Sequence, residues 1–180
     1  MAYVDTGLHL QYGSFEEARA WIGSETPPRD CEDEIERSQI KYFCSLVEDG
    51  NPSYWDEEWA RAHWGGILAP PGLLFVWSMP LLWRPGGEMR PPTIATQIPL
   101  PGDTVINVST DSRFLRPVLA GDRLSFVERV IDVSAEKKTQ LGAGHFITTE
   151  ITYRNHRGEV VGVHRNVLFR YRSTPEEARP

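Results

Sequence analysis

The chain has 180 residues and contains very little cysteine, with Cys31 and Cys44 as its whole complement. Two cysteines are too few for a disulfide framework, and they lack the Cys-x-x-Cys spacing that indicates zinc or redox sites. This scarcity fits a reducing, cytoplasmic environment. The N-terminus also lacks a basic segment followed by an apolar run, so the sequence predicts no signal peptide.

Long hydrophobic runs are missing as well. The longest, from Ile67 to Trp83, is interrupted by three prolines and a glycine, and it is too short and too broken to span a bilayer. An excess of basic residues is also absent, since the net charge is -6. Because nucleic-acid binders carry a basic footprint, we expect no nucleic-acid partner. The broken apolar run likewise leads us to expect no membrane partner.

What is present describes a folded protein. Hydrophobic residues make up 40% of the chain and charged residues 24%, with 6 Trp, 6 Tyr and 7 Phe. The length is that of one domain with a real core. We expect a single domain over residues 1–172, followed by a solvated tail over 173–180.

Helix signals fill the first half of the chain. Ser14 and Glu17 form a capping box that predicts a short helix after it. Ser38 can cap a second helix, in which apolar residues recur at helical spacing and which brings Asp49 to its C-terminal end. Gly50-Asn51-Pro52 cannot continue that helix, and Asp56 can cap another short one.

A different pattern begins at Pro71. The segment from Pro71 to about Trp83 is apolar on nearly every face, which predicts a helix buried all round. A connection rich in Pro and Gly follows, over residues 83–103. From Thr104 onward, β-branched and aromatic residues predict strands, the clearest at 124–131, 146–153 and 159–172.

One buried helix followed by long antiparallel strands predicts an α+β protein with the hot-dog fold, in which an antiparallel sheet wraps around a central buried helix. A helix packed across one open face of a sheet, as in cystatin-like or lipocalin-related shapes, is the alternative. Periodicity alone does not separate the two.

The segment Glu48 to Asp56 carries a family resemblance. It is similar to the Gly-Asp-x-Asn-Pro-x-His signature of the MaoC-like family, which comprises R-specific enoyl-CoA hydratases and 3-hydroxyacyl dehydratases. Asp49, Asn51 and Pro52 match that signature, and the position of its His is Tyr54. Three further segments resemble the family in the same order along the chain, at residues 64–71, 114–122 and 140–146.

Within the family, the resemblance is greatest to the MaoC-like part of the second subunits of actinobacterial steroid side-chain hydratases. Such subunits pair with a catalytic hot-dog chain. The resemblance therefore implies an acyl-CoA substrate with a bulky acyl group, and a second hot-dog subunit in a heterodimer or heterotetramer, or a homodimer. It implies no cofactor beyond the coenzyme A of the substrate.

The resemblance also assigns the candidate site. In active relatives, Asp and His hold the water that adds across the double bond, and an N–H at the start of the central helix polarises the thioester carbonyl. The corresponding catalytic candidates are Asp49 and Tyr54, although a phenol with a pKa of about 10 is a poor base near neutrality. The candidates for substrate binding are Asn51, Trp64, Gly66, Pro70, Gly72 and Trp77.

Further residues are candidates for the oxyanion donor, the base and the contacts with coenzyme A. Pro70 has no N–H to donate, so Gly72 is the alternative donor. His63 is the imidazole nearest to Tyr54 in sequence and is a substitute base or a packing residue. The remaining histidines have no acid or Cys at ligand spacing, so we expect no metal site. Basic residues that could meet the phosphates of coenzyme A are Arg84, Arg90, Arg116, Lys137 and Lys138.

The favoured hypothesis is a hydratase subunit that shapes the acyl tunnel of a catalytic partner and is itself non-catalytic. One alternative is a self-sufficient homodimeric hydratase that uses Asp49 with Tyr54. A hot-dog thioesterase is the other, and the absence of an acid from Pro71 to Trp83 counts against it, since that chemistry usually places an acid on the central helix.

Overall fold

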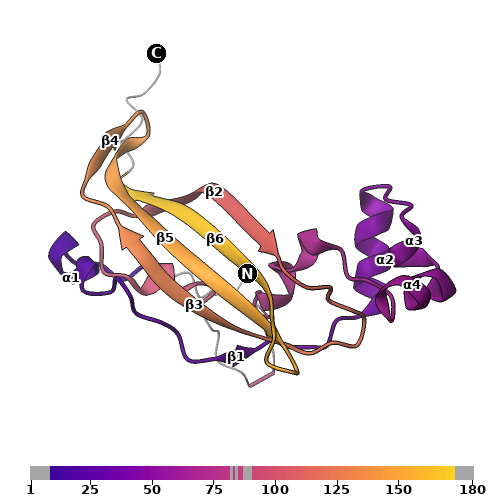
Figure 1. Ribbon diagram of the computed structural model, residues 1–180. Coiled ribbons are helices and arrows are strands. Elements are labelled where there is room, and N and C mark those ends of the chain that lie inside the picture. Colours follow the sequence, from indigo (N-terminus) through magenta and orange to yellow (C-terminus); the bar gives the residue numbers. More distant parts are fainter. Residues whose placement is uncertain (1–8, 82, 84, 87–90, 173–180) are drawn as a thin grey trace, which may run out of the picture.

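The computed structural model describes residues 9–81, 83, 85–86 and 91–172, so the predicted tail at 173–180 and the candidates Arg84 and Arg90 lie outside the described residues. Short helical segments precede a sheet of long strands (Figure 1). The elements in chain order are α1 (Phe15–Arg19), β1 (Arg29–Asp30), α2 (Arg37–Leu46), α3 (Pro52–Trp55), α4 (Glu57–Trp64), η1 (Pro71–Leu73), η2 (Val76–Ser78), η3 (Ile94–Gln97), β2 (Thr104–Phe114), β3 (Leu124–Val133), β4 (Lys137–Thr139), β5 (Gly142–Asn155) and β6 (Val160–Tyr171).

The sheet is antiparallel, with the strand order β1-β3-β5-β6-β2 and with β4 folded back onto β5. The long strands occupy the segments that the β-rich pattern indicates, although each extends beyond or ends short of its expected bounds. The two-residue β1 and the three-residue β4 have no sequence signal of that kind. At one edge of the sheet, the eleven-residue β2 pairs with β6 alone among the described strands.

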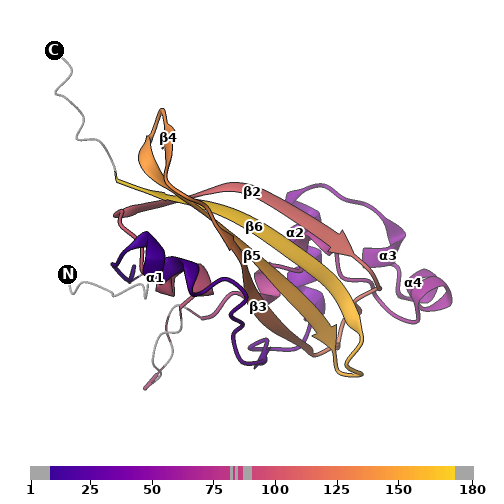
Figure 2. The same cartoon turned by 60° about the vertical axis from the view of Figure 1, so that its left-hand side comes forward.

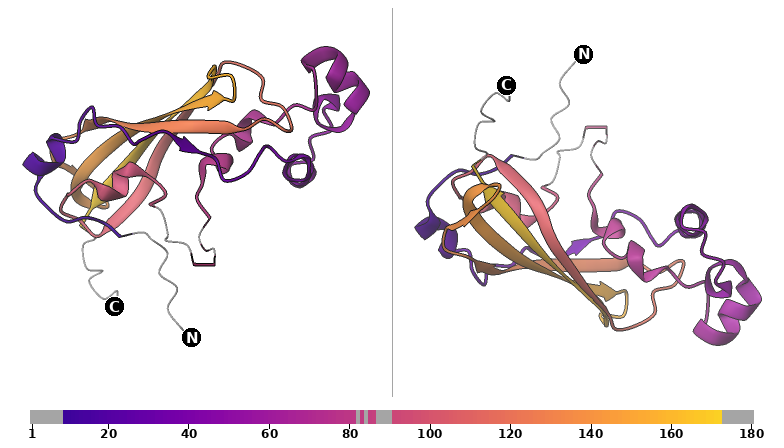
Figure 3. Two further views of the ribbon diagram at one scale, coloured as in Figure 1. Left: turned by 90° about the horizontal axis from the view of Figure 1, so that it is seen from below. Right: turned by 90° about the horizontal axis from the view of Figure 1, so that it is seen from above.

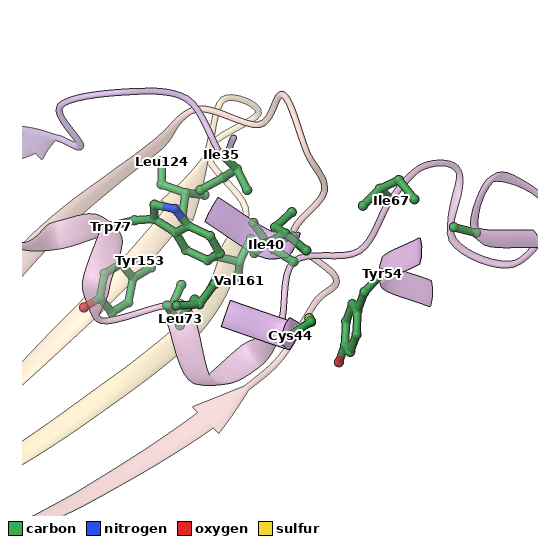
Figure 4. Close-up of a cluster of buried hydrophobic side chains, with 14 of the residues drawn as sticks. Ile35, Ile40, Cys44, Tyr54, Ile67, Leu73, Trp77, Leu124, Tyr153 and Val161 are labelled. Carbon is green, nitrogen blue, oxygen red and sulfur yellow. The ribbon is translucent and has the colours of Figure 1, made fainter. Parts of the chain in front are cut away.

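Two hydrophobic clusters lie on the concave face of the sheet, one toward each end. The first joins α2, η1 and η2 to the sheet, and includes Ile40, Trp77 and Tyr153 (Figure 4). The second joins α1 and η3 to the sheet, and includes Ile98 and Ile147. Figure 2 shows α1 and the helices α2–α4 at opposite ends of the sheet, which is where these two clusters require them.

The helices α2, α3 and α4 form an arm that extends beyond the end of the sheet (Figures 1 and 3). The predicted cap by Asp56 is confirmed, because its side chain accepts the Trp59 N–H at the start of α4. The sequence did not predict α3, where the Asn51 side chain accepts the Ser53 N–H. The start of α2 differs from the prediction. Glu36 is its N-cap, and the Ser38 hydroxyl instead donates to the Glu36 carboxylate at 3.0 Å. The capping box of Ser14 and Glu17 is confirmed.

The helix predicted from Pro71 to about Trp83 is wrong in form. The segment makes two short 3-10 turns, η1 and η2, and the chain is already extended at Met79. Pro80 bars continuation beyond Met79, whereas Pro70 and Pro71 stand at the start of the segment, where a helix tolerates proline. The prolines therefore limit the length of the segment but do not forbid a helix within it. Leu73, Leu74 and Trp77 are buried, but Val76, Met79, Leu81 and Trp83 are exposed, so the prediction that the segment is buried all round is also wrong.

A close approach holds these turns against the sheet. Gly162 in β6 faces Leu74, and a Cβ added at Gly162 would lie 2.5 Å from Leu74 Cδ2. The Trp77 indole N–H also donates to Gln39 Oε1 of α2 at 2.8 Å, and Ser78 Oγ lies 2.8 Å from the Tyr153 hydroxyl of β5. The η1–η2 segment is therefore fixed both to the arm and to the sheet. No helix among the described residues is long and apolar enough to cross a membrane.

Candidate functional site

The turn between α2 and α3 places Asp49 and Tyr54 together. The chain leaves α2 through Glu48, which has a left-handed backbone with φ 55°, and the Asp49 N–H donates to the Cys44 carbonyl at 2.9 Å. The Asp49 carboxylate then accepts the Asn51 N–H at 3.0 Å, while its carbonyl accepts the Trp55 indole N–H at 2.7 Å. Asp49 is half-buried, so one of its oxygens organises the turn.

Tyr54 is buried and 7% exposed. Burial raises the pKa of its phenol, and the charges of Asp49 and Cys44 raise it further. A phenol with a raised pKa keeps its proton at neutral pH, so Tyr54 can donate a hydrogen bond but cannot take a proton from water. In Figure 4, Ile40 and Cys44 of α2 lie between Tyr54 and the side chains of Leu73 and Trp77.

Two predicted substrate-binding residues belong to the framework of this arm. Asn51 caps α3, since its side chain accepts the Ser53 N–H at 3.0 Å. The Trp64 indole N–H donates to Ser53 Oγ at 3.0 Å, which ties the end of α4 back to α3. Trp64 and Trp55 keep about two fifths of their surface exposed, so both present aromatic surface on the arm.

The other predicted substrate-binding residues lie on the sheet side of α2. Pro70 is buried at the start of η1, and the exposed Gly72 carries the first backbone N–H of that turn, because Pro70 and Pro71 have none. Gly72 also touches the arm, since an added Cβ would lie 3.6 Å from Phe43 Cζ. Trp77 is buried in the first cluster, and Gly66 lies beside Leu119 rather than near η1.

The remaining candidates are dispersed. Arg116 lines a small apolar cavity with Pro70 and Trp77, whereas Lys137 and Lys138 belong to β4 at the end of the sheet opposite the arm (Figure 1). His63 stacks on Trp59 within α4, and its Nδ1 lies 2.7 Å from the Trp59 carbonyl oxygen. Because contacts within its own helix hold the ring, the structure gives no support to His63 as a substitute for the catalytic His that Tyr54 replaces.

A cavity of about 250 Å³ lies between η1 and the β2–β6 edge of the sheet, and sequence reasoning missed it. Its walls are apolar where η1 and Phe75 form them and polar where the sheet does; the polar residues are Asn107, Thr110, Ser112, His164 and Asn166. In the sequence, His164 has no acid or Cys at ligand spacing, so the sequence predicts no metal site there and assigns it no other role. Alternate residues of β2 and β6 supply the polar side chains of the cavity, which is the only signal in the sequence. The register of the two strands is needed to show that these side chains lie side by side.

The polar side of this cavity is ordered by hydrogen bonds within β2 and between β2 and β6. Asn107 Nδ2 donates to Thr110 Oγ1 at 3.0 Å, and Thr110 Oγ1 donates to Asn166 Oδ1 at 2.7 Å. Ser112 Oγ lies 2.8 Å from His164 Nδ1. Burial lowers the pKa of His164. Among the described residues, no group of three His, Cys, Asp or Glu side chains could hold a metal ion.

Comparisons with known proteins agree with this architecture. A family model for the dehydratase domain region of FAS1-like proteins matches residues 20–163. A probable enoyl-CoA hydratase alpha subunit of Thermomonospora curvata is 37% identical over 166 residues, which are 88% of this chain and 52% of that protein. The 3-oxo-4,17-pregnadiene-20-carboxyl-CoA hydratase alpha subunit of Mycobacterium tuberculosis is 31% identical over 144 residues, covering 77% and 46%. The chain thus spans about half the length of these two relatives.

A solved structure gives the same result in three dimensions. A chain of the ChsH1-ChsH2 complex from Mycobacterium tuberculosis matches with a TM-score of 0.73 and 27% identity, over 90% of this chain and 93% of that one. The antiparallel sheet with few helices is therefore the predicted hot-dog fold, rather than the open-faced alternative. By sequence and by structure, this chain belongs to the FAS1-like dehydratase family of MaoC-like domains.

Proposed function

We propose that this chain is the acyl-tunnel-shaping subunit of a heteromeric enoyl-CoA hydratase, and that a second hot-dog chain supplies the catalytic Asp and His. The reaction adds water to a trans-2-enoyl thioester to give the 3-hydroxyacyl thioester, or runs in reverse. The observation that carries the proposal is Tyr54, a buried phenol with a raised pKa at the position where active relatives have a His.

The catalytic groups that this chain lacks, a general base and an oxyanion-hole donor, support a non-catalytic role. General acid–base groups contribute about 100- to 10,000-fold to a rate, and one oxyanion-hole donor contributes about 100- to 1,000-fold. Tyr54 cannot act as a base at neutral pH, and Pro70 has no N–H to donate. Asp49 is also engaged, since its carboxylate accepts the Asn51 N–H in its own turn.

Support for a bulky acyl group comes from the space beside η1. Where the sequence predicts one long helix, the chain makes two short turns, and the 250 Å³ cavity lies between η1 and the β2–β6 edge. The related alpha subunit of Mycobacterium tuberculosis is named for a steroid-ring thioester. A fused-ring acyl group, such as a steroid, is therefore the substrate class that we propose.

Support for a hot-dog partner comes from the edge of the sheet and from the arm. The outer edge of β2 is unpaired within the described part of the chain, and an exposed edge strand of this length is a template for pairing with another strand. The arm carries exposed apolar side chains, namely Tyr42, Leu46, Val47, Trp55 and Trp64. We propose that the partner's sheet adds to β2 and that the arm covers the partner.

The test is a hydration assay on the chain alone and on its complex with a candidate partner that has an intact Asp and His. We expect the chain alone to hydrate crotonyl-CoA and a ring-bearing enoyl-CoA weakly or not at all, and the complex to be active. Asp49→Ala should change the activity of the complex little, because the dyad lies in the partner, while the corresponding change in the partner should abolish it.

The same assay separates the alternatives. The proximity of Asp49 and Tyr54 favours the homodimeric hydratase as the second candidate. Turnover by the chain alone at an ordinary enzymatic rate, abolished by Asp49→Ala, would replace the partner-subunit proposal with that one. Release of free coenzyme A without hydration would instead indicate a thioesterase, which the absence of an acid from residues 71–81 argues against.

A further inference from the structure

His164 is the feature of the cavity that the proposed reaction does not use. It is 5% exposed, and its ring stacks on Phe75 with centroids 4.5 Å apart and an interplanar angle of 9°. Its Nδ1 is paired with Ser112 Oγ, and its Nε2 is buried without a hydrogen bond of normal geometry in the described part of the protein. Burial lowers the pKa of His164, and the Asn166 side chain, a close polar neighbour of the ring, raises it by less. A buried polar atom left unpaired costs free energy, so it calls for an explanation.

His145 shows that the unpaired nitrogen is not a general feature of buried histidines in this sheet. It too is buried and stacks on a phenylalanine, Phe15, and its Nδ1 lies 2.9 Å from the Ser134 carbonyl oxygen. No nitrogen of His145 is among the unpaired buried atoms, and His145 does not line the cavity. Of the two residues, only His164 has a ring nitrogen among the buried atoms without a hydrogen bond, and only His164 lines the cavity.

The hydrogen bond between Ser112 Oγ and His164 Nδ1 has two possible directions, and the one in which Ser112 donates makes Nε2 a donor. A neutral imidazole carries one N–H, and a serine hydroxyl that donates to Nδ1 leaves that N–H on Nε2. The lowered pKa of His164 favours the neutral ring at pH 7. In this tautomer, Nε2 carries the N–H, beside a cavity whose other polar residues are the uncharged Asn107, Thr110, Ser112 and Asn166.

We infer that this cavity recognises an oxygen atom, a ketone or hydroxyl, on the ring system of the acyl group, with His164 Nε2 as the hydrogen-bond donor. The inference rests on the proposed acyl-binding function and adds the substrate class that the cavity selects. Uncharged polar partners suit a neutral oxygen rather than a carboxylate or phosphate. The cavity has room for about eight water molecules of ~30 Å³ each, enough for part of a fused ring.

The position of the cavity fits a substrate whose thioester is bound by the partner and whose acyl group extends into this chain. It is lined by η1, β6 and the edge strand β2, and it includes Gly72 with its backbone N–H. Since the proposed partner pairs along β2, an acyl chain held at the partner's dyad reaches this cavity across the interface. Apolar walls from Leu74, Phe75 and Phe114 would contact the ring carbons, while the sheet side supplies the polar groups.

The experiment compares binding of matched thioesters to the purified chain, in the assembly that it forms and with the candidate partner added. The probes are decalin-2-ylideneacetyl-CoA, three of its positional ring ketones and the corresponding alcohols, titrated by calorimetry. We expect at least one ketone or alcohol to bind about 3- to 10-fold more tightly than the unsubstituted probe, the effect of one neutral hydrogen bond. A preference for a ketone shows a donating Nε2, whereas a preference for an alcohol alone would show an accepting Nε2 and would overturn the donor role proposed for His164.

His164→Phe should abolish the preference and leave binding of the unsubstituted probe largely unchanged. The matched control His145→Phe, which also replaces a buried and stacked histidine, should keep it. If His164→Phe does not fold, Ser112→Ala tests the same site, because it keeps the ring but removes the hydroxyl that sets the tautomer, and it should reduce the preference. Melting curves identify any variant that has lost its fold.

The outcomes separate this inference from the proposed function. Equal binding of all probes by the unaltered chain would mean that the cavity holds only water, and it would overturn the oxygen site while the acyl-binding function stands. A preference that survives His164→Phe would overturn the role of His164. Failure of every probe to bind, with and without the partner, would contradict the proposed function and with it the inference.

Discussion

At the residue scale, His164 links burial to acid stability. Its pKa is depressed by burial, so below the ordinary value of 6.5 the unfolded chain binds this proton more readily than the folded chain does. Unfolding is then favoured as the pH falls through 6.5 toward the folded pKa, and the stability that His164 contributes as a neutral ring is present above that window. No acidic side chain lines the cavity among the described residues to offset the charge.

We therefore expect His164→Phe to reduce the loss of stability on acidification. Urea unfolding of both chains at pH 7.5 and pH 5.5 measures it, and the difference between the chains at pH 7.5 serves as the control for packing changes. The free energy of unfolding of the unaltered chain should fall more between the two pH values than that of the variant. Identical losses in the two chains would show that His164 titrates normally in the fold.

At the element scale, one buried carboxylate organises η3. Glu128 in β3 is 3% exposed, and its carboxylate accepts the Thr93 hydroxyl at 2.5 Å and the Ile94 N–H at 2.8 Å. Its own N–H donates to Thr26 Oγ1 at 3.0 Å. η3 has too few residues to be stable on its own, so its position depends on this side chain and on the second hydrophobic cluster.

Glu128→Ala should destabilise the protein by about 2–4 kcal/mol, because it leaves two buried donors without an acceptor and opens a cavity. Glu128→Gln is the matched control. It keeps one amide oxygen and the side-chain volume, so it should cost less than the alanine variant. Denaturant unfolding monitored by tryptophan fluorescence gives both values, and an alanine variant as stable as the unaltered chain would show that η3 is held by its apolar contacts alone.

At the scale of the whole molecule, the unpaired edge of β2 predicts association. Val108 lies at the bulge in this strand and is 49% exposed. A lysine there would place a charge in the proposed interface, and charged residues on edge strands oppose pairing with another chain. Val108→Lys should weaken assembly about tenfold or more, which corresponds to a loss of about 1.4 kcal/mol.

Leu141→Lys provides the control, since Leu141 is equally exposed, at 49%, but lies in the turn between β4 and β5. Light scattering at micromolar concentration, with and without the candidate partner, measures the mass of each variant. We expect an assembly for the unaltered chain and for Leu141→Lys. A monomer under both conditions, or an assembly indifferent to Val108→Lys, would count against β2 as the interface.

The sequence by itself determined the local features, because their causes lie within a few residues. The capping box of Ser14 and Glu17, the cap by Asp56, and the long strands all follow from short-range hydrogen bonding and alternation. The family signature around Asp49 also placed the chain among the MaoC-like domains, since such a turn requires Asn and Pro at set positions. The roles of Asp49 and Tyr54 stay predictions.

Only the tertiary structure decided how the apolar segment after Pro70 folds and what lies beside it. Apolar composition predicts burial but not helix length. Pro80 ends the segment, and packing of Leu74 against Gly162 holds its two short turns on the sheet. The pairing of Ser112 with His164 joins residues 52 positions apart. Such a pair exists only once the register of β2 on β6 is fixed, and that register is set by the whole sheet rather than by either strand.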